Sequence, residues 1–257
     1  MVNDPELTVV LPVYNEAGSI GSLIGEIAIA ARDCCRSLEI IVVDDASQDG
    51  SVAEVTTAFD QLAGANGEQP AIPVITLLIR QPWRQGQSVA LLAGFRAATG
   101  RMLLSMDADG QYDPAEIPRF IALMGEYDMV CGWRSNRSDG SARRIASLIA
   151  NIVRNRITGD QLTDAGCTFR IMRTECREVL LPLDGKLSGC EFFFHPLFLR
   201  LSGYRVKELP VVHRSRKGGK SHYRLVRGRW LAGLTASIRA VRLAKELTER
   251  HGGTGGG

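Results

Sequence analysis

Four short apolar runs, each placed before a polar turn, constrain the fold of this chain most strongly. The runs cover residues 7–13, 38–43, 74–79 and 102–106 and are rich in Val, Ile and Leu. Apolar residues at helical spacing follow them. Strand and helix units of about 30 residues are typical of a parallel sheet with right-handed crossovers. We therefore predict an α/β fold with a mostly parallel sheet and helices on both faces.

Acidic residues follow two of the predicted strands. Asp44 and Asp45 come after the second run, and Asp107 and Asp109 come after the fourth. Ligands of open α/β sheets bind at the carboxyl ends of the strands. Hard divalent cations take oxygen ligands and are commonly shared between one or two carboxylates and a substrate phosphate. The spacing therefore predicts that Asp107 and Asp109 hold Mg²⁺ or Mn²⁺ against a diphosphate.

Two acids further along have a simpler explanation. Asp113 stands where it can cap a helix, and Glu116 follows three residues later as its capping-box partner. Apolar residues then recur at helical spacing over residues 117–124. Asp107 and Asp109 lie too far upstream to cap this helix, so capping does not explain them.

Charge is divided unequally along the chain, although the net charge is only +3. Residues 1–131 carry 7 basic and 18 acidic side chains, a balance of −11, whereas residues 132–257 carry 24 basic and 10 acidic ones, a balance of +14. An acidic half can recruit a cation. A basic half can attract phosphates, nucleic acid or an anionic membrane surface.

Length and composition exclude several classes. A chain of 257 residues that is 45% hydrophobic can bury a full core. No apolar segment reaches the ~20 residues that span a bilayer, and no signal pattern opens the chain, so we expect a cytoplasmic location. Six cysteines without a Cys-x-x-Cys predict neither disulfides nor a zinc site. The first half is Rossmann-like but has neither a dinucleotide fingerprint nor a phosphate-binding loop.

Two stretches of the basic half predict amphipathic helices. Residues 143–157 place five apolar side chains on one stripe, with arginines off it, and this pattern favours a membrane interface. Residues 225–249 carry a similar stripe, for which packing on the sheet and membrane docking are equally expected. A helix over residues 192–201 and an extended segment over 204–213 lie between them.

Four motifs in order give the chain a family resemblance. They are LPVYNE at 11–16, VVDDASQDG at 42–50, GQSVALLAG at 86–94 and MDADGQ at 106–111. In this order they resemble the family 2 glycosyltransferases of the GT-A fold. The resemblance implies donor contacts and a metal site with Asp107, Asp109 and Gln111 as ligands. The implied donor-binding residues are Pro12, Tyr14, Glu16, Asp44, Asp45, Gly86 and Asp107.

Later motifs narrow the resemblance to the dolichyl- and polyprenyl-phosphate sugar transferases, of which the dolichyl-phosphate mannosyltransferases are one example. Arg134 ends a Gly-Trp-Arg where this subgroup has Gly-Ser-Arg, and residues 216–221 resemble its Arg-x-x-Gly-x-Ser loop. Three residues depart from the pattern of this subgroup: Trp133, Arg84 and His222. These substitutions affect the expected phosphate contacts and sugar preference. The implied acceptor-phosphate residues are Arg134, Arg143, Ser147, Arg216 and Ser221.

We therefore expect a metal-dependent, inverting transfer of a hexose from a UDP- or GDP-sugar to a polyprenyl or dolichyl monophosphate. Asp107, Asp109, Arg134 and Arg216 are the expected catalytic residues. The expected organisation is a GT-A domain over residues 1–224, a C-terminal amphipathic helix over 225–250 and a flexible tail over 251–257. Within the domain, residues 1–131 form the nucleotide half and residues 132–224 the acceptor half.

Expected partners are the nucleotide sugar, the lipid phosphate and the inner membrane face. A small membrane-protein partner is a further expected partner.

Two alternative functions stay open. A transferase with a saccharide or protein hydroxyl as acceptor would need a base such as Asp164 or Glu191. A non-catalytic binding protein for a nucleotide sugar or nucleic acid has no need for the acid pair, and the basic half has no recognisable nucleic-acid motif.

Overall fold

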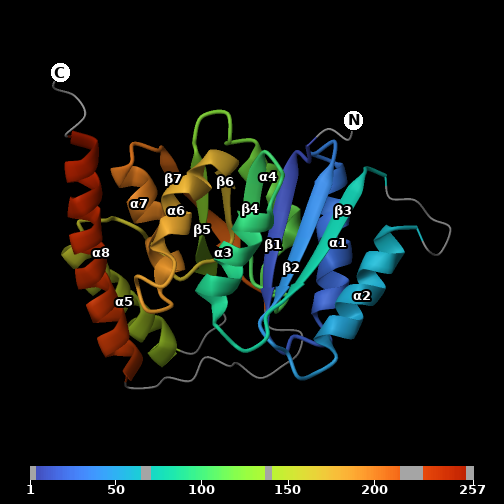
Figure 1. Ribbon diagram of the computed structural model, residues 1–257, viewed down its shortest axis with the longest axis horizontal. Helices are drawn as coiled ribbons and strands as arrows, with labels where there is room; N and C mark the ends of the chain where they lie inside the picture. Colours follow the sequence, from blue (N-terminus) through green and yellow to red (C-terminus); the bar gives the residue numbers. More distant parts are fainter. Residues whose placement is uncertain (1–3, 65–70, 137–140, 215–227, 253–257) are drawn as a thin grey trace.

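The computed structural model describes residues 4–64, 71–136, 141–214 and 228–252. One seven-stranded sheet with the order β3-β2-β1-β4-β6-β5-β7 runs through them (Figure 1). Six strands point in one direction, and only β6 is antiparallel to its neighbours. The strands are β1 (Leu7–Val13), β2 (Leu38–Asp44), β3 (Val74–Arg80), β4 (Met102–Ser105), β5 (Met129–Asn136), β6 (Arg170–Arg173) and β7 (Val206–Val212).

Helices cover both faces of the sheet because its central strands are apolar on both sides. In β1, Val9 and Leu11 join the core on one face, whereas Val10 joins the core on the other. The first core is closed by α1 (Ile20–Arg32), α2 (Ser51–Leu62) and α4 (Ile117–Ile121). The second is closed by α3 (Gln87–Ala97), α6 (Arg177–Leu180), α7 (His195–Leu201) and α8 (Gly228–Gly252).

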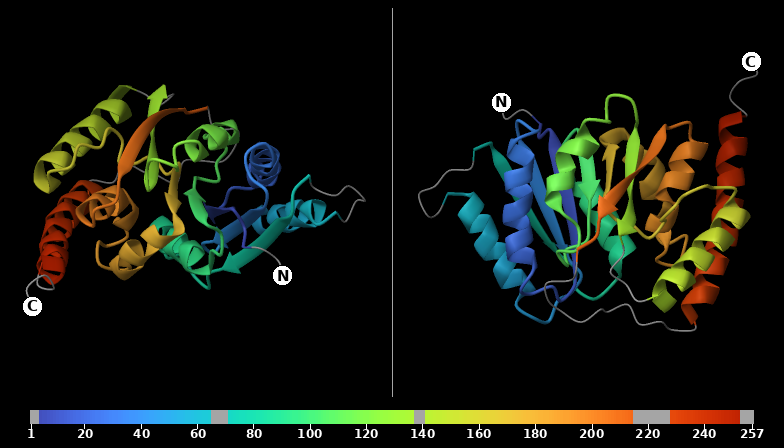
Figure 2. Two further views of the ribbon diagram at one scale, coloured as in Figure 1. Left: turned by 90° about the horizontal axis from the view of Figure 1, so that it is seen from above. Right: turned by 180° about the vertical axis from the view of Figure 1, so that it is seen from behind.

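Helix α5 (Ser141–Thr158) packs against α8, and the two lie together at the end of the sheet away from α2 (Figure 2). No helix in the described part of the chain is long and apolar enough to cross a membrane. The described residues also contain four single-turn 3₁₀ helices, at Pro114–Glu116, Thr174–Cys176, Leu181–Leu183 and Glu191–Phe194.

The predicted α/β architecture agrees with the structure. The four apolar runs become β1 to β4, residues 143–157 lie within α5, and residues 204–213 contain β7. The helix predicted over 192–201 is divided into the 3₁₀ turn at Glu191–Phe194 and α7. Strands β5 and β6 were not predicted. Residue 131 lies inside β5, so the two predicted halves share one sheet.

Candidate metal and nucleotide site

Asp107 and Asp109 lie at the carboxyl edge of the sheet, directly after β4. Met106 and Ala108 alternate with them and are buried in the core, which fixes the backbone of this segment. Asp109 is buried and its Oδ1 accepts a hydrogen bond from the backbone N–H of Gln111 at 3.0 Å. Asp107 is half-buried and accepts a hydrogen bond from the Gln87 carboxamide.

The neighbouring carboxylate of Asp109 disfavours the charged form of Asp107. Burial, and then the charge of Asp109, raises the pKa of Asp107 to about 7, against the opposing positive charge of Arg134. A divalent cation would relieve this repulsion. Among the described residues, no cluster of three or more His, Cys, Asp or Glu side chains could hold a metal alone. This donor set fits a cation that completes its coordination with water and substrate phosphate, as Mg²⁺ commonly does.

The structure separates the roles of the two predicted donor-site acids. Asp45 is buried, and its carboxylate accepts the backbone N–H groups of Gln85 and Gly86 at 2.6 and 2.9 Å. It therefore holds the loop that leads into α3. Gly86 has a φ of +96°, a conformation that favours glycine. This position thus needs a glycine for its backbone conformation.

Asp44 keeps one oxygen without a hydrogen bond. Its Oδ1 accepts the backbone N–H of Ser47 at 3.1 Å, whereas its buried Oδ2 has only an ion pair with Arg80 at 3.9 Å. The Oε1 atom of Gln81 is also buried and without a hydrogen-bond partner. A hollow of about 430 Å³, lined in part by Ser47, Arg80 and Gln81, lies here. Buried acceptors without donors indicate a place for a ligand that supplies them.

Tyr14 lies in the loop after β1, and the guanidinium of Arg84 stacks over its ring at 4.0 Å. Its neighbour Glu16 is fixed through its backbone N–H, which donates to the Ser51 hydroxyl at 2.8 Å. Pro12 lies within β1, in register with Val43 of β2. The Arg84 substitution noted in the sequence thus adds a cation against an aromatic residue of the predicted donor site.

Arg134 reaches the same edge from β5 and is tied to Asp164. Its Nε and Nη2 atoms donate to the two carboxylate oxygens at 2.7 and 2.9 Å, and both side chains are largely buried. Burial acts to lower the pKa of Arg134, but the hydrogen bonds and charge of Asp164 outweigh it and raise that pKa. This bidentate pair fixes the plane of the guanidinium near Asp107.

Both candidate bases of the hydroxyl-acceptor alternative are engaged in the fold. Asp164 is paired with Arg134, as described above. Glu191 is 1% exposed, and its Oε1 accepts the backbone N–H groups of Leu187 and Gly189 at 2.9 and 3.3 Å. These contacts give Glu191 a structural role in the turn before α7.

Four predicted acceptor residues have no described side chain. Arg143 and Ser147 lie in the first part of α5, residues 141–147, where only the backbone is described, and Arg216 and Ser221 lie outside the described residues. The last described residue before them, Arg214, donates its backbone N–H to the carbonyl of Gln111 at 2.7 Å.

The predicted helix cap is present in part. Asp113 accepts the backbone N–H of Ala115 at 3.0 Å, as predicted. Glu116 forms an ion pair with Arg119 at 2.8 Å. Asp113 thus caps the 3₁₀ turn after the metal segment, whereas Glu116 pairs with the helix that follows.

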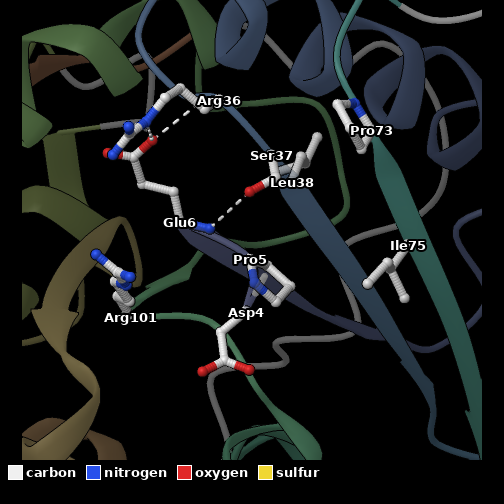
Figure 3. A pocket seen from close by; sticks show the side chains of 9 residues that line it. All are labelled: Asp4, Pro5, Glu6, Arg36, Ser37, Leu38, Pro73, Ile75 and Arg101. Carbon is white, nitrogen blue, oxygen red and sulfur yellow. Dashed lines mark hydrogen bonds and ion pairs between the residues drawn. The ribbon is translucent and has the colours of Figure 1, made fainter. Parts of the chain in front are cut away.

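A second pocket lies away from these residues, at the amino ends of the strands (Figure 3). It has a volume of about 400 Å³, and Glu6, Arg36 and Arg101 are among the residues that line it. Glu6 pairs with Arg36 at 3.7 Å within it. None of the predicted site residues lines this pocket.

Sequence reasoning missed three residues of the site edge: Gln81, Gln87 and Arg214. Gln87 follows Gly86 within the motif GQSVALLAG, so the motif could have identified it as a residue at the start of α3 and close to the site. Gln81 and Arg214 follow strands β3 and β7, where side chains enter the carboxyl edge. A search for polar residues within two positions of the end of every parallel strand would have found both Gln81 and Arg214.

The strand order and the acid-bearing edge define a GT-A fold, which solved structures share. A mannosyltransferase, PcManGT from Pyrobaculum calidifontis, solved with GDP-Man and Mn²⁺, gives a TM-score of 0.58 at 19% identity, covering 99% of this chain and 77% of that one. Glucosyl-3-phosphoglycerate synthase from Mycobacterium tuberculosis, solved with UDP, gives 0.60 at 17% identity, covering 91% and 80%. These similarities confirm the predicted fold.

The family model described as "Glycosyl transferase family 2" matches residues 8–180, and the chain therefore belongs to this family. Similar relatives are named undecaprenyl-phosphate 4-deoxy-4-formamido-L-arabinose transferase. The protein from Serratia proteamaculans (strain 568) is 34% identical over 223 residues, or 86% of this chain and 64% of the relative. The protein from Yersinia pestis (strain Pestoides F) is 33% identical over 229 residues, or 88% and 65%. The chain thus spans just under two thirds of their length.

Proposed function

We propose that this chain transfers a sugar from a nucleotide diphosphate sugar to a polyprenyl monophosphate, with inversion and with Mg²⁺ or Mn²⁺ as cofactor. The observation that carries the proposal is the arrangement of residues at the carboxyl edge of the sheet. It places the Asp107 and Asp109 pair on the same edge as a hollow with buried acceptors and near a fixed arginine. Relatives named as undecaprenyl-phosphate transferases support the lipid acceptor.

Asp107, Asp109 and Gln111 would hold the cation in this proposal. When bound, the cation would supply positive charge to the diphosphate of the departing nucleotide. Asp45 keeps the loop before α3 in place beside the donor. Tyr14, with Arg84 on its ring, lies on the nucleoside side.

The acceptor needs positive charge more than it needs a base. A phosphate monoester is already anionic near neutral pH, and its approach to the donor diphosphate is opposed by charge repulsion. Arg134 presents a fixed guanidinium near Asp107, and Arg143, Ser147, Arg216 and Ser221 are proposed to complete the acceptor site. The engagement of Asp164 and Glu191 in structural contacts favours the phosphate acceptor over a hydroxyl acceptor.

A transfer assay tests the proposal. The purified protein is incubated with Mn²⁺ or Mg²⁺, undecaprenyl phosphate and a panel of UDP- and GDP-sugars, and lipid-linked sugar is detected by mass spectrometry. The panel includes hexose donors, which the sequence motifs favour, and the UDP derivative of 4-deoxy-4-formamido-L-arabinose, which the relatives' names suggest. Absence of a lipid-linked product with every donor would contradict the proposal.

Asp44 is proposed to bind the nucleobase, because its buried Oδ2 can accept an N–H group such as the imide of uracil or guanine. The Asp44→Asn substitution should therefore weaken UDP or GDP binding about 10-fold or more, since hydrogen bonds to charged groups contribute about 1.5–3 kcal/mol. Isothermal titration calorimetry measures this affinity.

Asp45→Asn is the matched control for this measurement. Both carboxylate oxygens of Asp45 accept hydrogen bonds from the loop before α3. Asp45→Asn should therefore lower the unfolding temperature of the protein more than Asp44→Asn does. Equal nucleotide affinity in wild type and Asp44→Asn would remove Asp44 from the base site.

Membrane docking is proposed for the surface that α5 and α8 form. Leu148 and Ile152 of α5 are 60% and 52% exposed, and Leu234 and Ile238 of α8 are exposed as well. Helix α5 contains four arginines and no acidic residue; Arg156 is exposed, whereas Arg154 is buried in an ion pair with Asp160. An apolar surface with cationic residues suits the interface of an anionic bilayer. We propose peripheral binding at the inner membrane face, with a small membrane-protein partner as a further proposal.

The double substitution Leu148→Glu and Ile152→Glu should reduce binding to vesicles of phosphatidylglycerol and phosphatidylcholine at least about 5-fold, because it adds negative charge to the exposed apolar surface that is proposed to enter the bilayer interface. Co-sedimentation measures the bound fraction. Ile29→Glu is the control, since Ile29 is 57% exposed on α1, far from α8 (Figure 1). An equal loss in the control, or no loss in the double variant, would contradict docking by this surface.

A further inference from the structure

Arg214 contacts the predicted metal segment through both its backbone and its side chain. Its backbone N–H donates to the carbonyl of Gln111 at 2.7 Å, and its own carbonyl accepts the Gln111 Nε2 at 3.2 Å. Immediately before it, His213 forms a single antiparallel bridge with Tyr112, and the two rings meet edge to face at 5.5 Å. Residues 213–214 therefore form a short two-stranded contact with residues 111–112.

This contact determines which way the Gln111 carboxamide faces. A backbone carbonyl can only accept a hydrogen bond, so the end of the carboxamide directed at Arg214 must be its NH₂ group. The Oε1 atom is therefore the end directed elsewhere, and oxygen is the atom that Mg²⁺ or Mn²⁺ would take. The same residue also donates its backbone N–H to Asp109. Hydrogen bonds thus lead from Arg214 through Gln111 to Asp109.

The side chain of Arg214 fixes this backbone to two other elements. Its Nη1 lies 3.1 Å from the Glu26 Oε2 of α1, and its Nη2 pairs with the Asp113 carboxylate. Asp113 also caps the 3₁₀ turn that follows the metal segment. These three side chains are about one quarter to one third exposed. The guanidinium therefore joins α1, the end of the metal segment and the chain after β7 at one point.

We infer that Arg214 is a positioning residue for the metal site: it holds the Gln111 backbone and carboxamide in the orientation that directs Oε1 and Asp109 to the cation. The inference rests on the proposed metal-dependent function. Arg214 itself does not coordinate the cation. Its effect passes through Gln111, as hydrogen-bonded partners of metal ligands commonly act.

The test uses the full chain with Mn²⁺ as the probe, in the presence of UDP and, separately, GDP. Free Mn²⁺ is measured by electron paramagnetic resonance, so the readout does not depend on transfer activity. Arg214→Met removes both ion pairs but keeps the backbone contacts. It should raise the apparent Kd for Mn²⁺ about 3-fold or more, which is less than the roughly 10–100-fold cost of losing a direct partner of a metal ligand, because the backbone contacts to Gln111 remain.

Two further variants separate positioning from general destabilisation. Arg214→Lys keeps the charge but not the two-pronged guanidinium, so it should recover part of the affinity. Glu26→Gln is milder, because the pair with Asp113 stays, and it should give a smaller rise in Kd. Arg205→Met is the matched control: it removes an exposed pair with Asp128, and should leave the Kd unchanged.

The outcomes distinguish this inference from the proposed function. Wild-type Mn²⁺ affinity in Arg214→Met, or an equal loss in Arg205→Met, would overturn the positioning role. If Asp109→Ala retained wild-type Mn²⁺ affinity, the metal site itself would fail, whatever Arg214→Met showed. Thermal unfolding of each variant identifies any loss of affinity that comes from unfolding.

Discussion

Replacing Asp109 with alanine is expected to reduce metal-dependent sugar transfer at least about 100-fold. The substitution removes one of two carboxylates proposed to hold the cation, and even the partners of metal ligands contribute about 10–100-fold. Asp109 is buried beside β4, and no described cluster of three acidic, His or Cys residues could replace it. The measurement is the initial rate of lipid-linked sugar formation at saturating Mn²⁺.

Asp33→Ala serves as the control for this prediction. Asp33 is an exposed acid just after α1 that pairs with Arg32, so its loss should leave the transfer rate unchanged. Asp109→Asn keeps the volume of the side chain and should also be strongly impaired, because it loses the charge. Undiminished transfer in Asp109→Ala would exclude the proposed metal mechanism.

Replacing Arg134 with methionine is expected to lower the free energy of unfolding by roughly 3–5 kcal/mol, because removal of one partner leaves the other charge of a buried pair uncompensated. Asp164 is 9% exposed and would lose a bidentate partner. Chemical denaturation measures the change. The variant should also lose transfer, since the proposed acceptor site loses its fixed guanidinium.

A double variant separates these two effects. Arg134→Met combined with Asp164→Leu replaces the pair by apolar side chains, which is often neutral for stability. Stability should therefore return, whereas transfer should not. If the double variant recovered transfer together with stability, Arg134 would have only a structural role.

The first four strands could be predicted because their signal is local. Each is a continuous apolar run, as expected of strands such as β1, β2 and β4 that are buried on both faces, and the acids at the ends of β2 and β4 mark the carboxyl edge. Strand β6 carries no such signal. It contains Arg170, which is buried only because its guanidinium donates to the carbonyls of Phe192 and Ala165. Those partners are not visible in the sequence around it.

The site was predictable in its residue types and less so in their partners. Asp44 and Asp45 are adjacent and chemically alike, and only the structure shows that the loop at residues 85–86 occupies both oxygens of Asp45 while one oxygen of Asp44 stays without a hydrogen bond. Arg134 was identified from a motif, but its pair with Asp164 joins positions that are 30 residues apart. Such pairings depend on the order of strands in the sheet, and a motif does not contain that order.

The reversed direction of β6 has a consequence for how proteins of this design can diversify. Because β6 runs against β4 and β5, the chain before it arrives at the edge where those strands end, and it brings Asp164 there. Its ladder with β4 is only four residue pairs long. Insertions or exchanges before residue 170 would therefore alter the proposed acceptor side while β1 to β4 keep the proposed donor side intact. We expect evolutionary change in acceptor preference to concentrate in that segment.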